Sequence, residues 1–400
     1  MKESNAKNIL EHGERLSAIV EAEYPRFSSA EMARRRALMD EAMAERGVDH
    51  LVSHGAWFGR AAVTWLTQWP VTVEALLVYT PGEEGALFVQ FFNHGPLARR
   101  LTEGATVEWG GQSTIDTAIE ELTRRGAGNG RVAVQGAVPF NIHGKLAETF
   151  GDIADMNGDY YRMRLIKSDE EMDWFRIGAA LSDLSIDALN RDIRPGLTER
   201  DLCDIVEHAY LGGGGVNVIH FFSTTSMHNP ELCVPTQFPS TRKLQSGDII
   251  STEITTNFWD YGGQVLRTFS VGEPLTPLFQ ELHDTADAAY DAILSVLGPG
   301  AHARDIAKAA EVIDERGFTI YDDLVHGGGG NYNTPVIGTP SRPNHPVPDV
   351  TLRPGMMVIV QPNIITQDGS AGLQTGECIL ITETGAESIH TAPRGPFQVG

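Results

Sequence analysis

Residues 250–272 read ISTEITTNFWDYGGQVLRTFSVG, and this stretch decides the fold of the C-terminal half. Two runs rich in Ile, Thr, Val and Phe flank a segment whose aspartate and paired glycines are typical of a turn. The pattern therefore predicts two antiparallel strands that form a ribbon. Glu253 lies on the first strand, close to Ile250 and Ile254, and Gln264 lies on the second. We expect Glu253 to project into a cleft from which water is partly excluded.

The amino-acid composition is that of a globular protein with an acidic surface. The chain has 400 residues, enough for two domains, and 41% of them are hydrophobic. It carries 53 acidic against 31 basic residues, a formal net charge of −22. Such a chain repels phosphate groups, so we expect neither nucleic acid nor a membrane surface as its partner. An acidic surface is also typical of proteins from saline habitats.

Cysteine usage and the N-terminal residues indicate a cytoplasmic protein. Cys203, Cys233 and Cys378 are far apart in the sequence, which favours neither a disulfide framework nor a thiolate zinc site. Residues 1–10 are polar and charged, unlike a signal peptide. No apolar run approaches the roughly 18 residues that cross a bilayer. We therefore expect a soluble, cytoplasmic chain with reduced cysteines.

Strand and helix signals alternate in the first part of the chain. Short runs rich in Val and Leu, bounded by Gly or Pro, predict strands, and a charged helix is expected to end at Gly47. This alternation predicts a smaller N-terminal α/β domain over residues 1–163.

The pattern changes in residues 164–400. Ser168-Asp169-Glu170-Glu171 has the spacing of a capping box and begins a long helix. Two helices followed by strands make up the first part, and the same order returns from residue 277 onward. This order predicts an α+β fold class in which one α+β unit is duplicated.

Six motifs occur in one order along the second domain. They are MRLIKSDEE (163–171), HNP (228–230), the ribbon from GDIISTE to RTFSVG (247–272), LVHGGGG (324–330), LRPGMMVIVQPNI (352–364) and GECILITETGAE (376–387). Together they resemble the landmarks of the pita-bread family, which includes methionine aminopeptidase, prolidase and creatinase. The resemblance covers residues 160–400 and implies a creatinase-like two-domain protein with a pita-bread catalytic domain.

The metal-dependent members of this family hold two divalent ions with two Asp, one His and two Glu side chains. The resemblance places those positions at Glu253, Gln264, His326, Gln361 and Glu377. Two amides thus stand where carboxylates are expected, and a neutral amide is a poor ligand for a divalent cation. The resemblance therefore implies an enzyme with neither metal nor cofactor.

The metal-free branch of the family includes creatinase, which resembles this chain in its MR-x-IKS and HNP motifs. There the histidine of HNP is the catalytic acid–base, a position that falls on His228. Creatinase keeps carboxylates at the positions of Gln264 and Gln361, so the substrate here should carry less net positive charge. Ectoine hydrolases, which open the cyclic amidinium ring of a zwitterionic osmolyte, are similar to the chain in this respect.

This resemblance implies hydrolysis of ectoine, and of its 5-hydroxy derivative, to N-acetyl-diaminobutyrate. Glu253 is then the nucleophile that forms a covalent intermediate. His228 protonates the departing nitrogen and later activates water. Glu377 orients a histidine or binds the amidinium.

Further side chains are expected to bind the substrate. His326 precedes a glycine run whose amides suit a carboxylate. Trp57 and Phe58 lie in an aromatic loop and suit stacking on an amidinium. In the family's homodimers such a loop closes the partner's site, so the resemblance also implies a homodimer. The remaining candidates are Gln264, Gln361, Tyr261 and Phe222.

Structural alternatives stay open for each of these residues. Glu253 pairs with Arg267 across the ribbon in one alternative, and His228 is a solvated loop residue in another. Alternative functions are a creatinase-like amidinohydrolase, an enzyme like the dimethylsulfoniopropionate lyases, and a degenerate Xaa-Pro peptidase homologue that binds small solutes. The alternatives for the other residues are a turn beside His326, a buried acid at Glu377, glutamines without a task, and domain-interface packing of Trp57 and Phe58.

Overall fold

The computed structural model describes residues 13–56, 61–328, 333–340, 342 and 346–400. The chain forms two compact units, one of which is Glu23–Arg164. The other is Leu165–Gly400 together with the N-terminal segment that ends at Ala22. Helix α2 (Glu14–Glu21) therefore belongs to the larger unit, although the sequence predicts one domain over residues 1–163. An ion pair between Arg15 and Asp173 at 2.5 Å explains the difference, because it joins α2 to the long helix of that unit.

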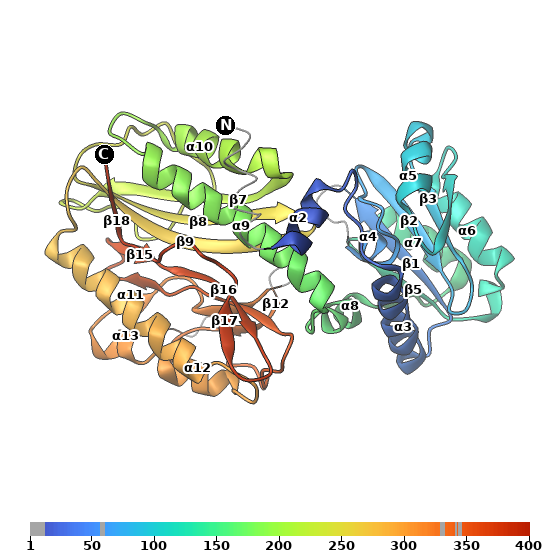
Figure 1. Cartoon of the computed structure of the whole chain (residues 1–400). Coiled ribbons are helices and arrows are strands. Elements are labelled where there is room, and N and C mark those ends of the chain that lie inside the picture. The colour runs from blue at the N-terminus through green and yellow to red at the C-terminus, as the bar shows by residue number, and fades with distance from the viewer. Residues whose placement is uncertain (1–12, 57–60, 329–332, 341, 343–345) are drawn as a thin grey trace. The chain divides into compact units, whose positions relative to one another are not determined.

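The smaller unit is a mixed sheet with helices (Figure 1). Central strand β1 (His50–Ala56) pairs antiparallel with β2 (Glu74–Tyr79) and parallel with β5 (Val132–Gln135). Outside these lie β3 (Gly85–Val89), β4 (Ala105–Trp109) and β6 (Ala154–Asp155), in the order β4-β3-β2-β1-β5-β6. The helices are α3 (Ser29–Arg46), α4 (Ala61–Thr67), α5 (Gly95–Leu101), α6 (Thr114–Arg124), α7 (Phe140–Phe150) and α8 (Asn157–Met163), with short 3₁₀ turns at Phe92–His94 and Ala127–Asn129.

The larger unit is built on a long antiparallel sheet with strand order β12-β11-β13-β16-β9-β8-β7. Its strands are β7 (Gly215–Ser226), β8 (Asp248–Phe258), β9 (Tyr261–Val271), β11 (Val325–Gly327), β12 (Asn333–Ile337), β13 (Met357–Val360) and β16 (Gly376–Ile381), with β17 (Ala386–Ser388) beside β16 and β18 (Phe397–Val399) beside β9. A smaller sheet contains β10 (Thr319–Ile320), β14 (Asn363–Ile365) and β15 (Gly372–Gln374).

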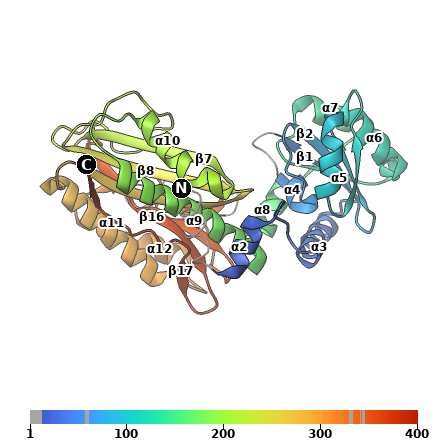
Figure 2. The same cartoon turned by 45° about the horizontal axis from the view of Figure 1, so that its top comes forward.

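Helices cover one face of the long sheet. The capping box predicted at Ser168 is confirmed, since its side chain accepts from Glu171 N and begins α9 (Asp169–Asp192). Figure 2 shows α9 and α10 (Glu199–Tyr210) along β7, β8 and β9. The second set of helices comprises α11 (Pro277–Val296), α12 (Ala303–Ala309) and α13 (Val312–Glu315). The sequence ARDIAKAAEVIDERG (303–317) reads as one continuous helix, whereas the structure divides it into α12 and α13.

The predicted ribbon is confirmed as β8 and β9. Glu253 pairs with Leu266, and Phe258 pairs with Tyr261 at the tight turn, where Trp259 has a φ of 56°. Successive side chains of a strand point to opposite faces, and directly paired residues share a face. Glu253 therefore faces away from α9 and α10, because the next residue, Ile254, pairs with His220, whose ring contacts Tyr210 of α10.

The apolar run MMVIVQPNII (356–365) reads as one strand, but in the structure it is interrupted at Gln361-Pro362. Pro362 has no N–H to donate to a sheet, so β13 ends before it and β14 begins after it in the smaller sheet. Gln361 therefore lies at the point where the chain passes from one sheet to the other.

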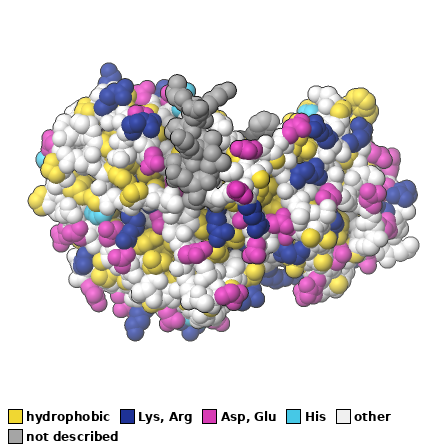
Figure 3. All heavy atoms as spheres, viewed as in Figure 1, with side chains coloured by type: hydrophobic (Ala, Val, Ile, Leu, Met, Phe, Trp, Pro, Cys, Tyr) yellow, Lys and Arg dark blue, Asp and Glu magenta, His cyan; other side chains and the backbone are white. Residues whose placement is uncertain are grey.

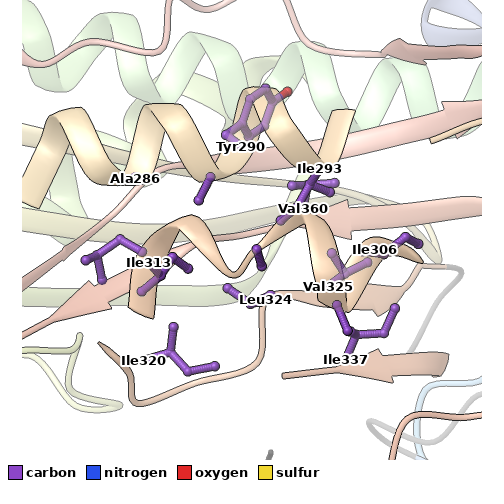
Figure 4. Close-up of a cluster of buried hydrophobic side chains, with 14 of the residues drawn as sticks. Ala286, Tyr290, Ile293, Ile306, Ile313, Ile320, Leu324, Val325, Ile337 and Val360 are labelled. Atoms are coloured by element: carbon purple, nitrogen blue, oxygen red, sulfur yellow. The ribbon is translucent and has the colours of Figure 1, made fainter. Parts of the chain in front are cut away.

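A large apolar core fixes the second half of the larger unit (Figure 4). Ala286, Tyr290 and Ile293 of α11 meet Ile306 of α12 and Ile313 of α13, and all are buried. Figure 4 shows these side chains together with Val325, Ile337 and Val360 of the strands. The core thus holds β11, which carries His326, and β13, which Gln361 directly follows.

Acidic and basic side chains are interspersed on the face seen in Figure 3. None of the described helices is long and apolar enough to cross a membrane.

Candidate active site

Glu253 is held in a chain of side-chain hydrogen bonds on the face of the long sheet that lies away from α9 and α10. Nε2 of Gln264 donates to Oε1 of Glu253 at 3.0 Å and to Oε1 of Gln361 at 2.9 Å. Nε2 of Gln361 donates to Oδ1 of Asp323 at 3.4 Å. Three of the predicted residues are thus brought together. The series of hydrogen bonds ends on the carboxylate of Asp323, which is not among the residues predicted from the sequence.

The backbone explains why these side chains meet. Gln264 lies two residues from Leu266, the partner of Glu253, so both polar side chains share one face of the ribbon. Gln361 N donates to Leu324 O at 2.8 Å, which places Gln361 beside the chain that enters β11. Gln361 and Asp323 are each 1% exposed.

The environment of Glu253 favours its protonated form. Burial, followed by the charges of Asp322 and Asp323, raises the pKa of Glu253 to about 8. The alternative pairing with Arg267 does not occur, because Arg267 lies on the other face of the ribbon opposite Thr252. The charged groups that act on Glu253 are instead carboxylates, so a cationic ligand is the natural counter-charge.

Asp322 and Asp323 are additions to the site predicted from sequence. Burial, a hydrogen bond with Asp323 and the charge of Asp323 raise the pKa of Asp322 to about 6. The backbone N–H of Asp323 donates to Oδ1 of Asp322 at 2.9 Å. The signal was available in YDDLVHGGGG, where two acids directly precede the strand that carries His326. The family motif LVHGGGG begins at Leu324, so it does not include these two acids.

His326 lies in the same site, and its imidazole ring is neutral. Its Nδ1 is 3.1 Å from the carbonyl oxygen of Gly327, so Nδ1 carries the proton and Nε2 is the unprotonated nitrogen. Burial lowers the pKa of His326 despite the opposing effects of that carbonyl and of Asp322. The side chain of Gln361 acts in the opposite sense to burial and favours the protonated ring, which raises the pKa of His326. His326 therefore lies beside the hydrogen-bonded side chains that hold Glu253.

His228 does not meet Glu253. It lies two residues beyond the end of β7, and its Nε2 is 3.1 Å from Oε2 of Glu273. The side chain of His228 is 63% exposed. Ser226 pairs with Asp248, five residues along β8 from Glu253, which is about 17 Å at the usual rise of a strand. The expected catalytic pairing of His228 with Glu253 is therefore absent from the structure.

Glu377 lies on the helix-covered face rather than beside Glu253. It pairs with Val360 in β13, and the alternation of side chains sends Gln361 to the opposite face. Its carboxylate accepts from Arg267 Nη2 at 2.5 Å and from Tyr290 Oη at 3.0 Å. Burial raises the pKa of Glu377, but the charges of Arg267 and His390 outweigh burial and hold the pKa below its usual value. The expected role of Glu377 in catalysis is replaced by a buried ion pair.

Two aromatic candidates also face the helices. The hydroxyl of Tyr261 donates to Oε1 of Glu171 in α9 at 3.1 Å. Phe222 is 1% exposed and pairs with Thr252, so its neighbour Phe221, which pairs with Glu253, is the one that shares the face of the site. Tyr261 and Phe222, which were expected to bind the substrate, thus lie on the face of the sheet opposite Glu253. Trp57 and Phe58 lie outside the described residues.

The donor set does not fit a pair of divalent ions. The amide nitrogen of Gln264 is turned toward Glu253, and an N–H donor cannot ligate a cation. Among the residues that the structure describes, no three His, Cys, Asp or Glu side chains are placed to hold a metal.

Comparison with known proteins agrees with this architecture. Residues 173–383 match the model of metallopeptidase family M24. The creatinase of Bacillus sp. (strain B-0618) is 23% identical over 407 residues, which cover 93% of each chain. A probable dipeptidase PepE of Mycobacterium tuberculosis is 27% identical over 256 residues, covering 62% of this chain and 64% of that protein.

Solved structures show the same fold at low identity. The prolidase from Pyrococcus horikoshii OT3 has a TM-score of 0.77 and 18% identity, covering 90% of this chain and 99% of its own. The X-Pro aminopeptidase from Thermotoga maritima MSB8 has a TM-score of 0.78 and 20% identity, covering 91% and 99%.

The fold and the site thus define a two-domain hydrolase with the pita-bread architecture of creatinase and prolidase, as the sequence predicts. The chain belongs to metallopeptidase family M24.

Proposed function

We propose that the chain is a metal-independent hydrolase that opens the cyclic amidine ring of ectoine, and of its 5-hydroxy derivative, to give N-acetyl-diaminobutyrate. Glu253 is the nucleophile, and the intermediate is covalently bound to it. We also propose that the enzyme acts in the cytoplasm as a homodimer.

The observation that carries the proposal is the set of acceptors around Glu253. Gln264 uses both hydrogens of Nε2 on Glu253 and Gln361, so its Oε1 remains an acceptor. In the described part of the chain, no side chain donates to Oε1 of Gln264 or to Oε2 of Glu253. An amidinium ring offers N–H donors and a positive charge, which complement two acceptors and a carboxylate-rich setting.

The reaction on these groups consumes one ectoine and one water and restores Glu253. Oε2 of Glu253 attacks the amidinium carbon, and the C=N electron pair moves to nitrogen. Collapse of this adduct breaks one ring C–N bond, and the leaving nitrogen takes a proton. One water then adds, which releases the acetamide product and restores the carboxylate.

Asp322 is the candidate for these proton transfers, because His228 lies at the far end of the strands. Its pKa is raised to about 6, and a proton-transfer group works best when its pKa is near the operating pH.

The test is proton NMR of the purified enzyme with ectoine, run with and without EDTA. Ring opening should proceed equally in both samples, and Glu253→Gln should abolish turnover while ectoine still binds in calorimetry. Activity that disappears with EDTA would refute metal independence. Hydrolysis of creatine or of an Xaa-Pro dipeptide in place of ectoine would refute the substrate, and unchanged turnover in Glu253→Gln would refute the nucleophile.

A further inference from the structure

The two glutamines form a hydrogen-bonded chain that has one direction. Gln264 donates to Glu253 and to Gln361, and Gln361 donates to Asp323. Each amide has a donor end and an acceptor end. Turning Gln361 round would set its oxygen against the carboxylate of Asp323 and its NH₂ against that of Gln264. Turning Gln264 round would set its oxygen against the carboxylate of Glu253 once that group is ionised for attack. In the reactive state the direction is therefore imposed by the carboxylates at the two ends.

We infer that Asp323 is a positioning residue whose carboxylate sets the direction of this amide chain and thereby holds Oε1 of Glu253. The other carboxylate oxygen of Glu253 then stays available to the substrate. Asp323 acts through Gln361, with which it shares a hydrogen bond, and through Gln264. The inference rests on the proposed function only in its last step, the attack by Glu253.

A carboxylate suits this task better than any other side chain of the same size. It has no donor when ionised, so it accepts from Gln361 in every orientation. Asparagine has the same shape but can present its NH₂, which allows both glutamines to turn. The carbonyl oxygen of Gln264 would then face Glu253 and repel the ionised nucleophile.

The surroundings hold Asp323 in place for this role. The residue is 1% exposed, directly precedes Leu324, and is linked through its N–H to Asp322.

The first test is kinetic and uses a paired substitution in the presence of EDTA. Asp323→Asn should lower kcat for ectoine about 100-fold with little change in KM, since a misplaced catalytic group commonly has an effect of this size. Adding Gln361→Glu should restore most of the loss. The new carboxylate accepts from the introduced asparagine on one side and from Gln264 on the other, so the original direction returns.

The control for this rescue is Asp322→Asn. Asp322 is the adjacent acid and acts on Glu253 through its charge, but the hydrogen bond of Gln361 goes to Asp323. Gln361→Glu should therefore not rescue Asp322→Asn. Equal rescue of both single variants, or no rescue of Asp323→Asn, would overturn the inference.

A second test needs no substrate, so it separates failure of this inference from failure of the proposed function. With glutamine labelled by ¹⁵N in the side chain, the Gln264 amide signal is assigned by its absence in Gln264→Glu. Its protons should exchange slowly in the wild type, quickly in Asp323→Asn, and slowly again when Asp323→Asn is combined with Gln361→Glu. Unchanged exchange in Asp323→Asn would overturn the inference. Should that variant not fold, Gln361→Met removes the same link and must give the same fast exchange.

Discussion

Glu253 combines two properties that oppose each other in the free enzyme. Burial and the neighbouring carboxylates raise its pKa to about 8, whereas attack on carbon needs the ionised form. A bound cation removes the conflict, because its charge favours the carboxylate. The substrate would thus ionise the group that attacks it, and the free enzyme would hold that group mostly protonated at neutral pH.

The pH dependence of kcat/KM for ectoine should follow this carboxyl group. The ionised form is the reactive one, so kcat/KM should rise with pH and level off above an inflection at about 8. Initial rates by NMR between pH 5.5 and 9.5, at substrate concentrations well below KM, measure this profile. A profile that is flat or falls over that range would contradict a nucleophile with a raised pKa.

The difference in thermal stability between the wild type and Glu253→Gln provides the control, because it reports the pKa of Glu253 without turnover. The folded state keeps a proton on Glu253 between the ordinary carboxyl pKa of 4.5 and about 8, whereas the unfolded chain has released it. Stability due to this group is therefore present below pH 4.5 and lost as pH rises toward 8. The wild type should lose stability relative to Glu253→Gln over that interval.

The sequence predicts that Glu253, Gln264, His326 and Gln361 belong to one site, because the spacing of the motifs matches that of the family although the residue types differ. It does not show that Glu377, Tyr261 and Phe222 lie on the opposite face from Glu253, because a motif gives the position of a residue along the chain and not the face of the strand. Counting alternation from Glu253 would have excluded Phe222, since the register Phe221 to Glu253 leaves Phe222 opposite Thr252. The separation of His228 from Glu253 depends on the pairing of β7 with β8, which no local sequence pattern gives.

The helix-covered side of β9 and β16 holds a buried ion pair that joins several elements. Arg267 is 0% exposed and donates to Glu377 and to the carbonyl oxygens of Leu266, Gly376, Ala392 and Pro393. Asp183 of α9 accepts from His390 and Thr391 in the same C-terminal stretch. These contacts tie α9, β9 and β16 to residues 390–393, so this network supports the sheet that carries the site.

Arg267→Met should therefore destabilise the fold strongly. Removing one partner of a buried ion pair leaves an uncompensated charge and typically costs about 3–5 kcal/mol. For a unit of this size the melting temperature should fall on the order of 10 °C. Differential scanning calorimetry at pH 7.5 measures the change, and Arg191→Met in the exposed Arg191–Asp192 pair is the control that should shift it little.

Glu377→Gln separates this structural role from a catalytic one. It removes the charge but keeps a hydrogen-bonding group beside Tyr290, so the variant should melt earlier than the wild type. At a temperature where it stays folded, it should keep ectoine turnover within a few-fold of the wild type. Loss of turnover in a folded Glu377→Gln would return Glu377 to the reaction.

The whole molecule carries a formal net charge of −22, far from neutrality. Acidic side chains outnumber basic ones 53 to 31, although the two kinds are interspersed on the face in Figure 3. The excess acidic side chains repel one another, and this repulsion disfavours the compact state. Salt screens that repulsion, because the Debye length falls from about 30 Å at 0.01 M to about 3 Å at 1 M.

Raising KCl from about 0.02 M to about 1 M at pH 7.5 should therefore raise the melting temperature by several degrees. Differential scanning fluorimetry across a salt series measures the change. The same series near pH 5, close to the sequence pI of about 4.9, is the control, because the net charge is then near zero and the repulsion is gone. There the salt effect should vanish or reverse, since screening then acts mainly on attractive pairs such as Arg242–Asp248. A melting temperature that falls with salt at pH 7.5 would mean that ion pairs, and not net repulsion, dominate the electrostatic free energy of this fold.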